Sequence, residues 1–114
     1  MKIGDPTLAD TEIGPLIRHA ETERVDEWVQ DAINKGAELI SGGKKISDSC
    51  YQATVLLNPP ADATISQNEV FGPVICVYEY EDIDEAIKQA NSLDVAFQAA
   101  VFSKNIDTCM HTFK

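Results

Sequence analysis

The stretch EVFGPV, residues 69–74, leads into the most apolar segment of the chain and decides how its fold is interpreted. The strand predicted over 74–80 is apolar on both faces, which is typical of a central strand in a sheet covered by helices. Asp82 then predicts a helix N-cap for a helix over 83–90. A second apolar strand is predicted over 98–102. Strand, helix and strand with short connections predict a βαβ unit with parallel strands.

The residues before this stretch predict one amphipathic helix and two short strands. Apolar residues recur at helical spacing over 21–35, and Gly36 is the expected stop. Either His19 or Thr22 fits as the N-cap. Strands are expected over 37–41 and 51–57, and a brief helical turn over 65–69. The glycine pair that follows the first strand lacks the spacing of a phosphate-binding loop.

Composition excludes several classes of protein. The net charge of −10 argues against nucleic acid or an anionic membrane as partner. The 114 residues suffice for one domain, and they contain no apolar run that could span a bilayer. The three cysteines, Cys50, Cys76 and Cys109, show neither disulfide nor zinc spacing, so a reducing cytoplasm is the expected compartment and no metal site is expected.

Taken by itself, the stretch 69–74 has a purely structural interpretation. Gly72 and Pro73 form a turn, Phe71 anchors the core, and Glu69 is a helix cap or a solvated charge. The alternative is that Glu69 and Phe71 belong to a binding site. The spacing of these residues alone favours the structural interpretation, whereas comparison of the rest of the chain with a known family favours the binding site.

The order and spacing of short motifs resemble the aldehyde dehydrogenase family over essentially all 114 residues. The matching stretches are 4–6, 13–16, 23–25, 36–37, 42–43, 53–56, 69–74, 90–93 and 99–103. The chain departs from the family at 95–98, where it reads VAFQ and many members have Tyr-Gly-Leu.

The resemblance implies a fold and a function. The fold would be α/β, a three-layer α/β/α arrangement with a mostly parallel sheet, with residues 1–114 forming part of the catalytic domain. The parent protein would be an oxidoreductase that uses NAD or NADP to oxidise an aldehyde to a carboxylic acid, through thiolate attack, hydride transfer and thioester hydrolysis. Glu69 would accept hydrogen bonds from the nicotinamide ribose hydroxyls, and Phe71 would pack near the nicotinamide.

Other parts of that enzyme have no counterpart in these residues. The family nucleophile lies in a Gly-Gln-x-Cys context, which none of the three cysteines has, so no catalytic residue is assigned here. The general base and the dinucleotide-binding domain would also lie upstream of residue 4. We therefore expect the isolated chain to be inactive and to bind no cofactor.

The expected partners are the remaining parts of the catalytic and cofactor domains. An exposed apolar patch would mark where they pack, leading to a homo-oligomer or to disordered ends. The alternatives are a stand-alone, non-catalytic remnant and a small nucleotide-binding or interaction module with the same fold.

Overall fold

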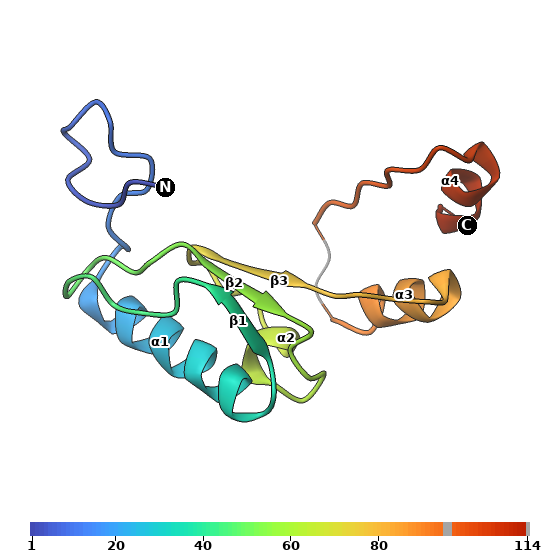
Figure 1. The fold of residues 1–114 in the computed structure, drawn as a ribbon, viewed down its shortest axis with the longest axis horizontal. Helices are drawn as coiled ribbons and strands as arrows, with labels where there is room; N and C mark the ends of the chain where they lie inside the picture. The colour runs from blue at the N-terminus through green and yellow to red at the C-terminus, as the bar shows by residue number, and fades with distance from the viewer. Residues whose placement is uncertain (95–96, 114) are drawn as a thin grey trace. The chain divides into compact units, whose positions relative to one another are not determined.

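The computed structural model describes residues 1–94 and 97–113 and contains two compact units, Met1–Glu79 and Tyr80–Lys114 (Figure 1). Residues 95 and 96, which begin the VAFQ departure from the family pattern, lie outside the described residues. Among the helices that are described, none has the length and apolar character needed to cross a membrane.

The first unit is built around the helix α1 (His19–Asn34), which Figure 1 labels. The helix buries one apolar stripe. Val25, Val29 and Ala32 are all fully buried, which confirms the predicted helical spacing. Gly36 follows the helix with φ of 112°, a conformation that favours glycine, so the predicted stop is also confirmed.

The start of α1 differs from the prediction. The N-cap residue is Arg18, whose backbone is extended and whose side chain makes no capping bond. His19 is already helical, and its Nδ1 lies 2.8 Å from the carbonyl oxygen of Asp48. Thr22 is fully buried within the helix. Neither predicted residue caps the helix, because a contact with the loop around residue 48 fixes His19 and burial fixes Thr22.

The sheet of the first unit is mixed. Its strands are β1 (Glu38–Ser41), β2 (Thr54–Leu57) and β3 (Val74–Val77), in that order across the sheet (Figure 1). β1 and β2 are antiparallel, whereas β2 and β3 are parallel and are joined by a connection that contains the short helix α2 (Thr64–Gln67). The predicted α/β class is confirmed, with one parallel and one antiparallel pair in place of a mostly parallel sheet.

The central strand is β2, and the prediction that the strand after residue 73 is central was wrong. β3 lies at the edge of the sheet, where Ile75 is 62% exposed and Val77 is 42% exposed. Continuous apolar sequence was interpreted as burial on both faces, but within residues 1–79 only one face of this strand is covered.

Helices cover one face of the sheet. Leu56 and Tyr51 form a single core with residues of α1 and α2, and Val74 and Cys76 pack against it. The opposite face, which we call the open face, carries Val55, Leu57, Ile75 and Val77, as the register between β2 and β3 requires. Two of the three expected layers therefore lie within residues 1–79.

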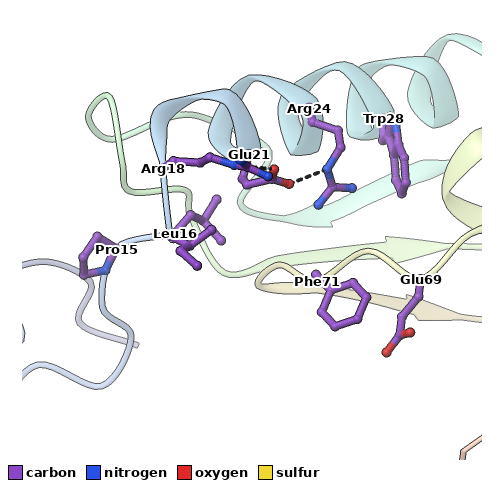
Figure 2. Close-up of a pocket in the computed structure, with 9 residues that line it drawn as sticks. Pro15, Leu16, Arg18, Glu21, Arg24, Trp28, Glu69 and Phe71 are labelled. Atoms are coloured by element: carbon purple, nitrogen blue, oxygen red, sulfur yellow. Dashed lines mark hydrogen bonds and ion pairs between the residues drawn. The ribbon is translucent and has the colours of Figure 1, made fainter.

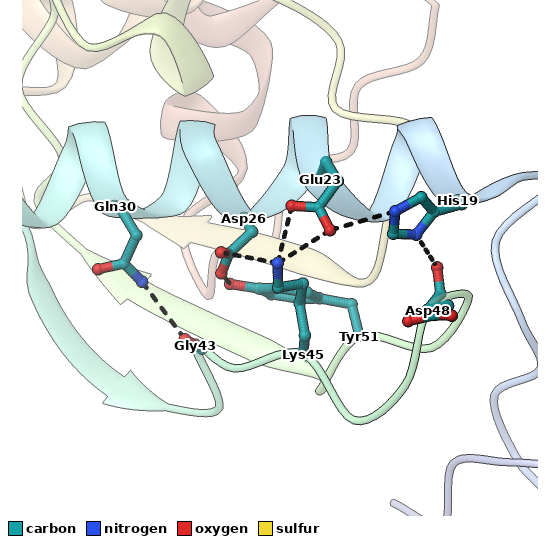
Figure 3. A network of polar contacts seen from close by, with 8 residues as sticks. All are labelled: His19, Glu23, Asp26, Gln30, Gly43, Lys45, Asp48 and Tyr51. Atoms are coloured by element: carbon teal, nitrogen blue, oxygen red, sulfur yellow. Dashed lines mark hydrogen bonds and ion pairs between the residues drawn. The ribbon is translucent and has the colours of Figure 1, made fainter.

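A polar network fixes the loop between β1 and β2 onto α1 (Figure 3). Lys45 Nζ donates to Glu23 Oε2 over 2.7 Å and lies 3.8 Å from Asp26 Oδ2. The buried Tyr51 donates its hydroxyl proton to Asp26 Oδ1 over 3.0 Å. A Cβ at Gly42 would lie 2.3 Å from the Ala53 carbonyl oxygen, and a Cβ at Gly43 would lie 2.8 Å from Leu39 Cδ2, so the glycine pair permits close packing.

The second unit contains two short helices, α3 (Ile83–Ala90) and α4 (Ile106–Thr112). Asp82 caps α3 by accepting from the Asp84 N–H over 2.8 Å, as its sequence predicts. Asn105 caps α4 by accepting from the Asp107 N–H over 2.9 Å.

The strand predicted over 98–102 does not form. Residues 97–102 have no strand assignment, and Phe97 and Phe102 are 100% and 95% exposed. The predicted βαβ unit with β3 is therefore absent. A strand requires a neighbour for its backbone N–H and C=O groups, and apolar composition alone does not supply one.

Candidate functional site

The first unit holds a pocket of about 620 Å³ beside the N-terminal half of α1 (Figure 2). The loop before α1, the helix itself and the segment between α2 and β3 contribute to its wall. The lining residues are Pro15, Leu16, Ile17, Arg18, Glu21, Arg24, Trp28, Glu69 and Phe71. Both residues that the sequence singled out for binding are among them.

Glu69 and Phe71 lie on one short segment and both line this pocket (Figure 2). Glu69 is exposed, and within residues 1–94 and 97–113 its carboxylate has no hydrogen-bond partner. The residue after α2 is Asn68, so Glu69 does not cap that helix. Of the two structural alternatives for Glu69, only the solvated charge agrees with the structure.

Phe71 is 75% exposed, which rules out the interpretation of this ring as a core anchor. Its φ is 45°, in the left-handed region that an aromatic residue rarely adopts. Such backbone strain persists only where the surroundings impose it. The core contact of this segment is made by the neighbouring Val70, which packs against the buried cluster.

Arg24 connects α1 to this segment. Its Nη2 donates to the Val70 carbonyl oxygen over 2.6 Å, and its Nε donates to Glu21 Oε2 over 2.7 Å. The guanidinium carbon lies 4.3 Å from the ring centroid of Trp28, a cation–π geometry. Arg24, and then Arg18, hold the pKa of the Glu21 carboxyl below its ordinary value.

Sequence reasoning missed Glu21, Arg24 and Trp28 as pocket residues. The available signal was their spacing, since positions 21, 24 and 28 fall on one helical face. Nothing in the spacing indicates that the segment at 69–71 lies against that face, because this requires the tertiary fold.

The profile described as "Aldehyde dehydrogenase family" matches residues 1–114. The chain belongs to the aldehyde dehydrogenase family. A 3-sulfolactaldehyde dehydrogenase of Priestia aryabhattai is 39% identical over 108 residues, which are 95% of this chain and 22% of that protein. A succinate-semialdehyde dehydrogenase of Schizosaccharomyces pombe, whose name specifies NADP(+), is 35% identical over 117 residues, covering 100% of this chain and 24% of that protein.

Solved structures of aldehyde dehydrogenases share the fold of the chain. The crystal structure of aldehyde dehydrogenase 21 from Physcomitrella patens, in complex with the reaction product succinate, matches with a TM-score of 0.93 at 32% identity. The match covers 99% of this chain and 23% of that one. The chain thus spans less than a quarter of the length of these aldehyde dehydrogenases.

The three cysteines of this aldehyde dehydrogenase segment are all free, and none lines the pocket. Cys50 lies in the loop between β1 and β2 and is buried there. Burial raises the pKa of Cys76, which disfavours a reactive thiolate there. Cys109 lies in α4. No cluster of three metal-binding side chains occurs among the described residues.

Proposed function

We propose that this chain is part of an NAD(P)-dependent aldehyde dehydrogenase that oxidises an aldehyde to a carboxylic acid. Glu69 and Phe71 would form its contacts with the nicotinamide half of the cofactor. The observation that carries the proposal is that both side chains line one pocket of about 620 Å³, with the carboxylate of Glu69 unpaired among the described residues.

The side chains of the pocket fit the nicotinamide nucleoside portion. A free carboxylate accepts hydrogen bonds from two adjacent ribose hydroxyls, and the exposed ring of Phe71 offers an apolar surface to a planar heterocycle. Both arginines of the pocket donate to Glu21, which leaves Glu69 as the available acceptor. When bound, the cofactor supplies the acceptor for the hydride that leaves the substrate carbon.

The chemical step would depend on residues outside this chain. The family nucleophile has no counterpart in the sequence, so the isolated chain would not turn over an aldehyde and would hold no dinucleotide tightly. The open face would be covered by the remaining polypeptide of the catalytic domain, because Ile75 and Val77 are exposed there. The free cysteines suit a cytoplasmic enzyme.

A hybrid enzyme tests this proposal. Residues 1–114 replace the matching segment of 3-sulfolactaldehyde dehydrogenase, and NAD(P)H formation is followed with its aldehyde. Glu69→Gln keeps the size of the side chain and removes the charge. We expect weaker cofactor binding or slower hydride transfer by about 1.5–3 kcal/mol, the range for a hydrogen bond to a charged group.

The matched control is Glu27→Gln, which changes an exposed carboxylate of α1 outside the pocket. It should leave the KM for cofactor and the transfer rate unchanged. If Glu69→Gln behaves like this control but lowers the melting temperature, Glu69 has a structural role and the assignment fails. A second measurement uses the 114-residue chain alone. Tight binding of the dinucleotide by that chain would favour a self-contained nucleotide-binding module.

A further inference from the structure

We propose that Arg24 is a positioning residue that fixes the turn at 69–71, so that Glu69 and Phe71 both face the pocket. This inference rests on the proposed function for the role of the two side chains, and on the contacts of Arg24 for the positioning itself.

The hydrogen bond from Arg24 acts on the backbone between the two candidate binding residues. The carbonyl of Val70 belongs to the planar peptide unit that includes the Phe71 nitrogen. Its 2.6 Å bond to Arg24 Nη2 therefore restrains the rotation of that unit, which sets ψ of Val70 and φ of Phe71. This is the φ found at 45°. A bond at this atom orients Phe71 directly, and Glu69 through the adjoining residue.

Arg24 is itself held in place by two further contacts. Glu21 Oε2 accepts from its Nε (Figure 2), and the guanidinium carbon lies over the ring of Trp28. The side chain is only 25% exposed. A guanidinium offers donors in a fixed planar arrangement, so one group can bond to Glu21 and Val70 while stacking on an aromatic ring. A lysine has no such geometry.

Arg18 provides a matched comparison within the same pocket. It also donates to Glu21, over 3.1 Å, but its side chain is 72% exposed. Among the described residues its side chain bonds to Glu21 alone. If the charge around Glu21 were what ordered the turn, both arginines would contribute. If the contact with Val70 orders it, only Arg24 does.

The test measures backbone order in the 114-residue chain by nitrogen-15 relaxation, comparing wild type, Arg24→Gln and Arg18→Gln. We expect order parameters at residues 69 and 71 to fall from about 0.85 to below about 0.6 in Arg24→Gln and to stay unchanged in Arg18→Gln. Order within β2 should not change in either variant. Emission from Trp28, the only tryptophan, should shift in Arg24→Gln alone.

Two results would overturn the positioning role. One is wild-type order at 69–71 in Arg24→Gln, and the other is an equal loss of order in both variants. If Arg24→Gln does not fold, the order parameters are measured in Arg24→Lys, which keeps the charge and the aliphatic stem. The same two results in that variant would overturn the positioning role.

In the hybrid enzyme, Arg24→Gln should raise the KM for cofactor about tenfold, and an unchanged KM would contradict the link to the cofactor. The proposed function fails separately, when Glu69→Gln leaves the hybrid unaffected while Arg24→Gln still loosens the turn of the isolated chain.

Discussion

Gly72 lies against Val25 so closely that a Cβ added to the glycine would come within 2.8 Å of Val25 Cγ2. Val25 is fully buried and β-branched, so its side chain has little freedom to move away. This contact lets the segment at 69–73 lie directly on α1. Together with the bond from Arg24 to Val70, it places Glu69 and Phe71 beside the helix.

Gly72→Ala should therefore destabilise the first unit. Overpacking a closed contact typically costs about 1–3 kcal/mol, and we expect a loss of that size in the free energy of unfolding by urea. Gly14→Ala is the control, because a Cβ there would lie 3.7 Å from Pro6, an ordinary contact. Equal stability of the two variants would mean that the segment moves off the helix at little cost.

Phe71 should contribute backbone strain and little packing. A core anchor would lose packing when truncated to alanine, but the ring of Phe71 is 75% exposed. Its φ of 45° favours glycine over any residue with a Cβ. We expect Phe71→Gly to be more stable than Phe71→Ala by about 1 kcal/mol, measured by urea unfolding of both variants. An alanine variant as stable as the glycine variant would contradict the strained conformation.

Local sequence patterns predicted the structure correctly where a residue interacts with other residues of its own helix or with the ends of that helix. The stripe that contains Val25 and Val29, the stop at Gly36 and the cap at Asp82 follow from spacing and side-chain chemistry, and all three are confirmed. The class of the fold follows from the order of such elements. The placement of Glu69 and Phe71 in one pocket was predicted only through the family resemblance.

Patterns failed where a residue depends on distant parts of the chain. Arg24 reaches Val70 across 46 positions, which no periodicity encodes. The segments at 74–80 and 98–102 were both predicted as strands from their apolar sequence, yet only the first finds a neighbouring strand, β2. Apolar composition indicates that a segment can be buried, and the neighbours that bury it are set by topology.

Tyr51 should stabilise the loop between β1 and β2 through its hydroxyl. The buried phenol donates to Asp26, so Tyr51→Phe leaves that carboxylate without this donor. We expect a loss of about 1.5–3 kcal/mol in the free energy of unfolding, the range for hydrogen bonds to charged groups. Tyr80→Phe is the control, because Tyr80 is 61% exposed. Equal effects of the two changes would mean that the bond to Asp26 contributes nothing.

The same tyrosine should make stability depend on alkaline pH. Burial, and then the bond to Asp26, raises the pKa of Tyr51 above its ordinary value of 10.0. The folded state therefore favours the neutral phenol, and the unfolded chain releases its proton first. This stabilisation is complete below pH 10.0 and decreases as the pH rises through and above that value. Urea unfolding between neutral and alkaline pH should show a smaller alkaline loss in Tyr51→Phe than in wild type.

The open face should drive self-association of the isolated chain. Ile75, 62% exposed at the edge strand β3, lies on the same face as the exposed Val77 and the half-buried Val55 and Leu57. Exposed apolar sheet surface on the strand that ends the sheet of the first unit favours pairing with a second copy. We expect Ile75→Lys to weaken association by about tenfold or more, since each 1.4 kcal/mol of lost apolar contact is tenfold in the dissociation constant. Sedimentation equilibrium measures that constant.

The control is Leu8→Lys, which adds the same charge at an apolar side chain that is 52% exposed and lies outside the sheet. This variant should leave association unchanged. A wild-type chain that stays monomeric at high micromolar concentration would show that the open face is tolerated in water. Equal weakening by both lysines would show that net charge, and not this face, controls association.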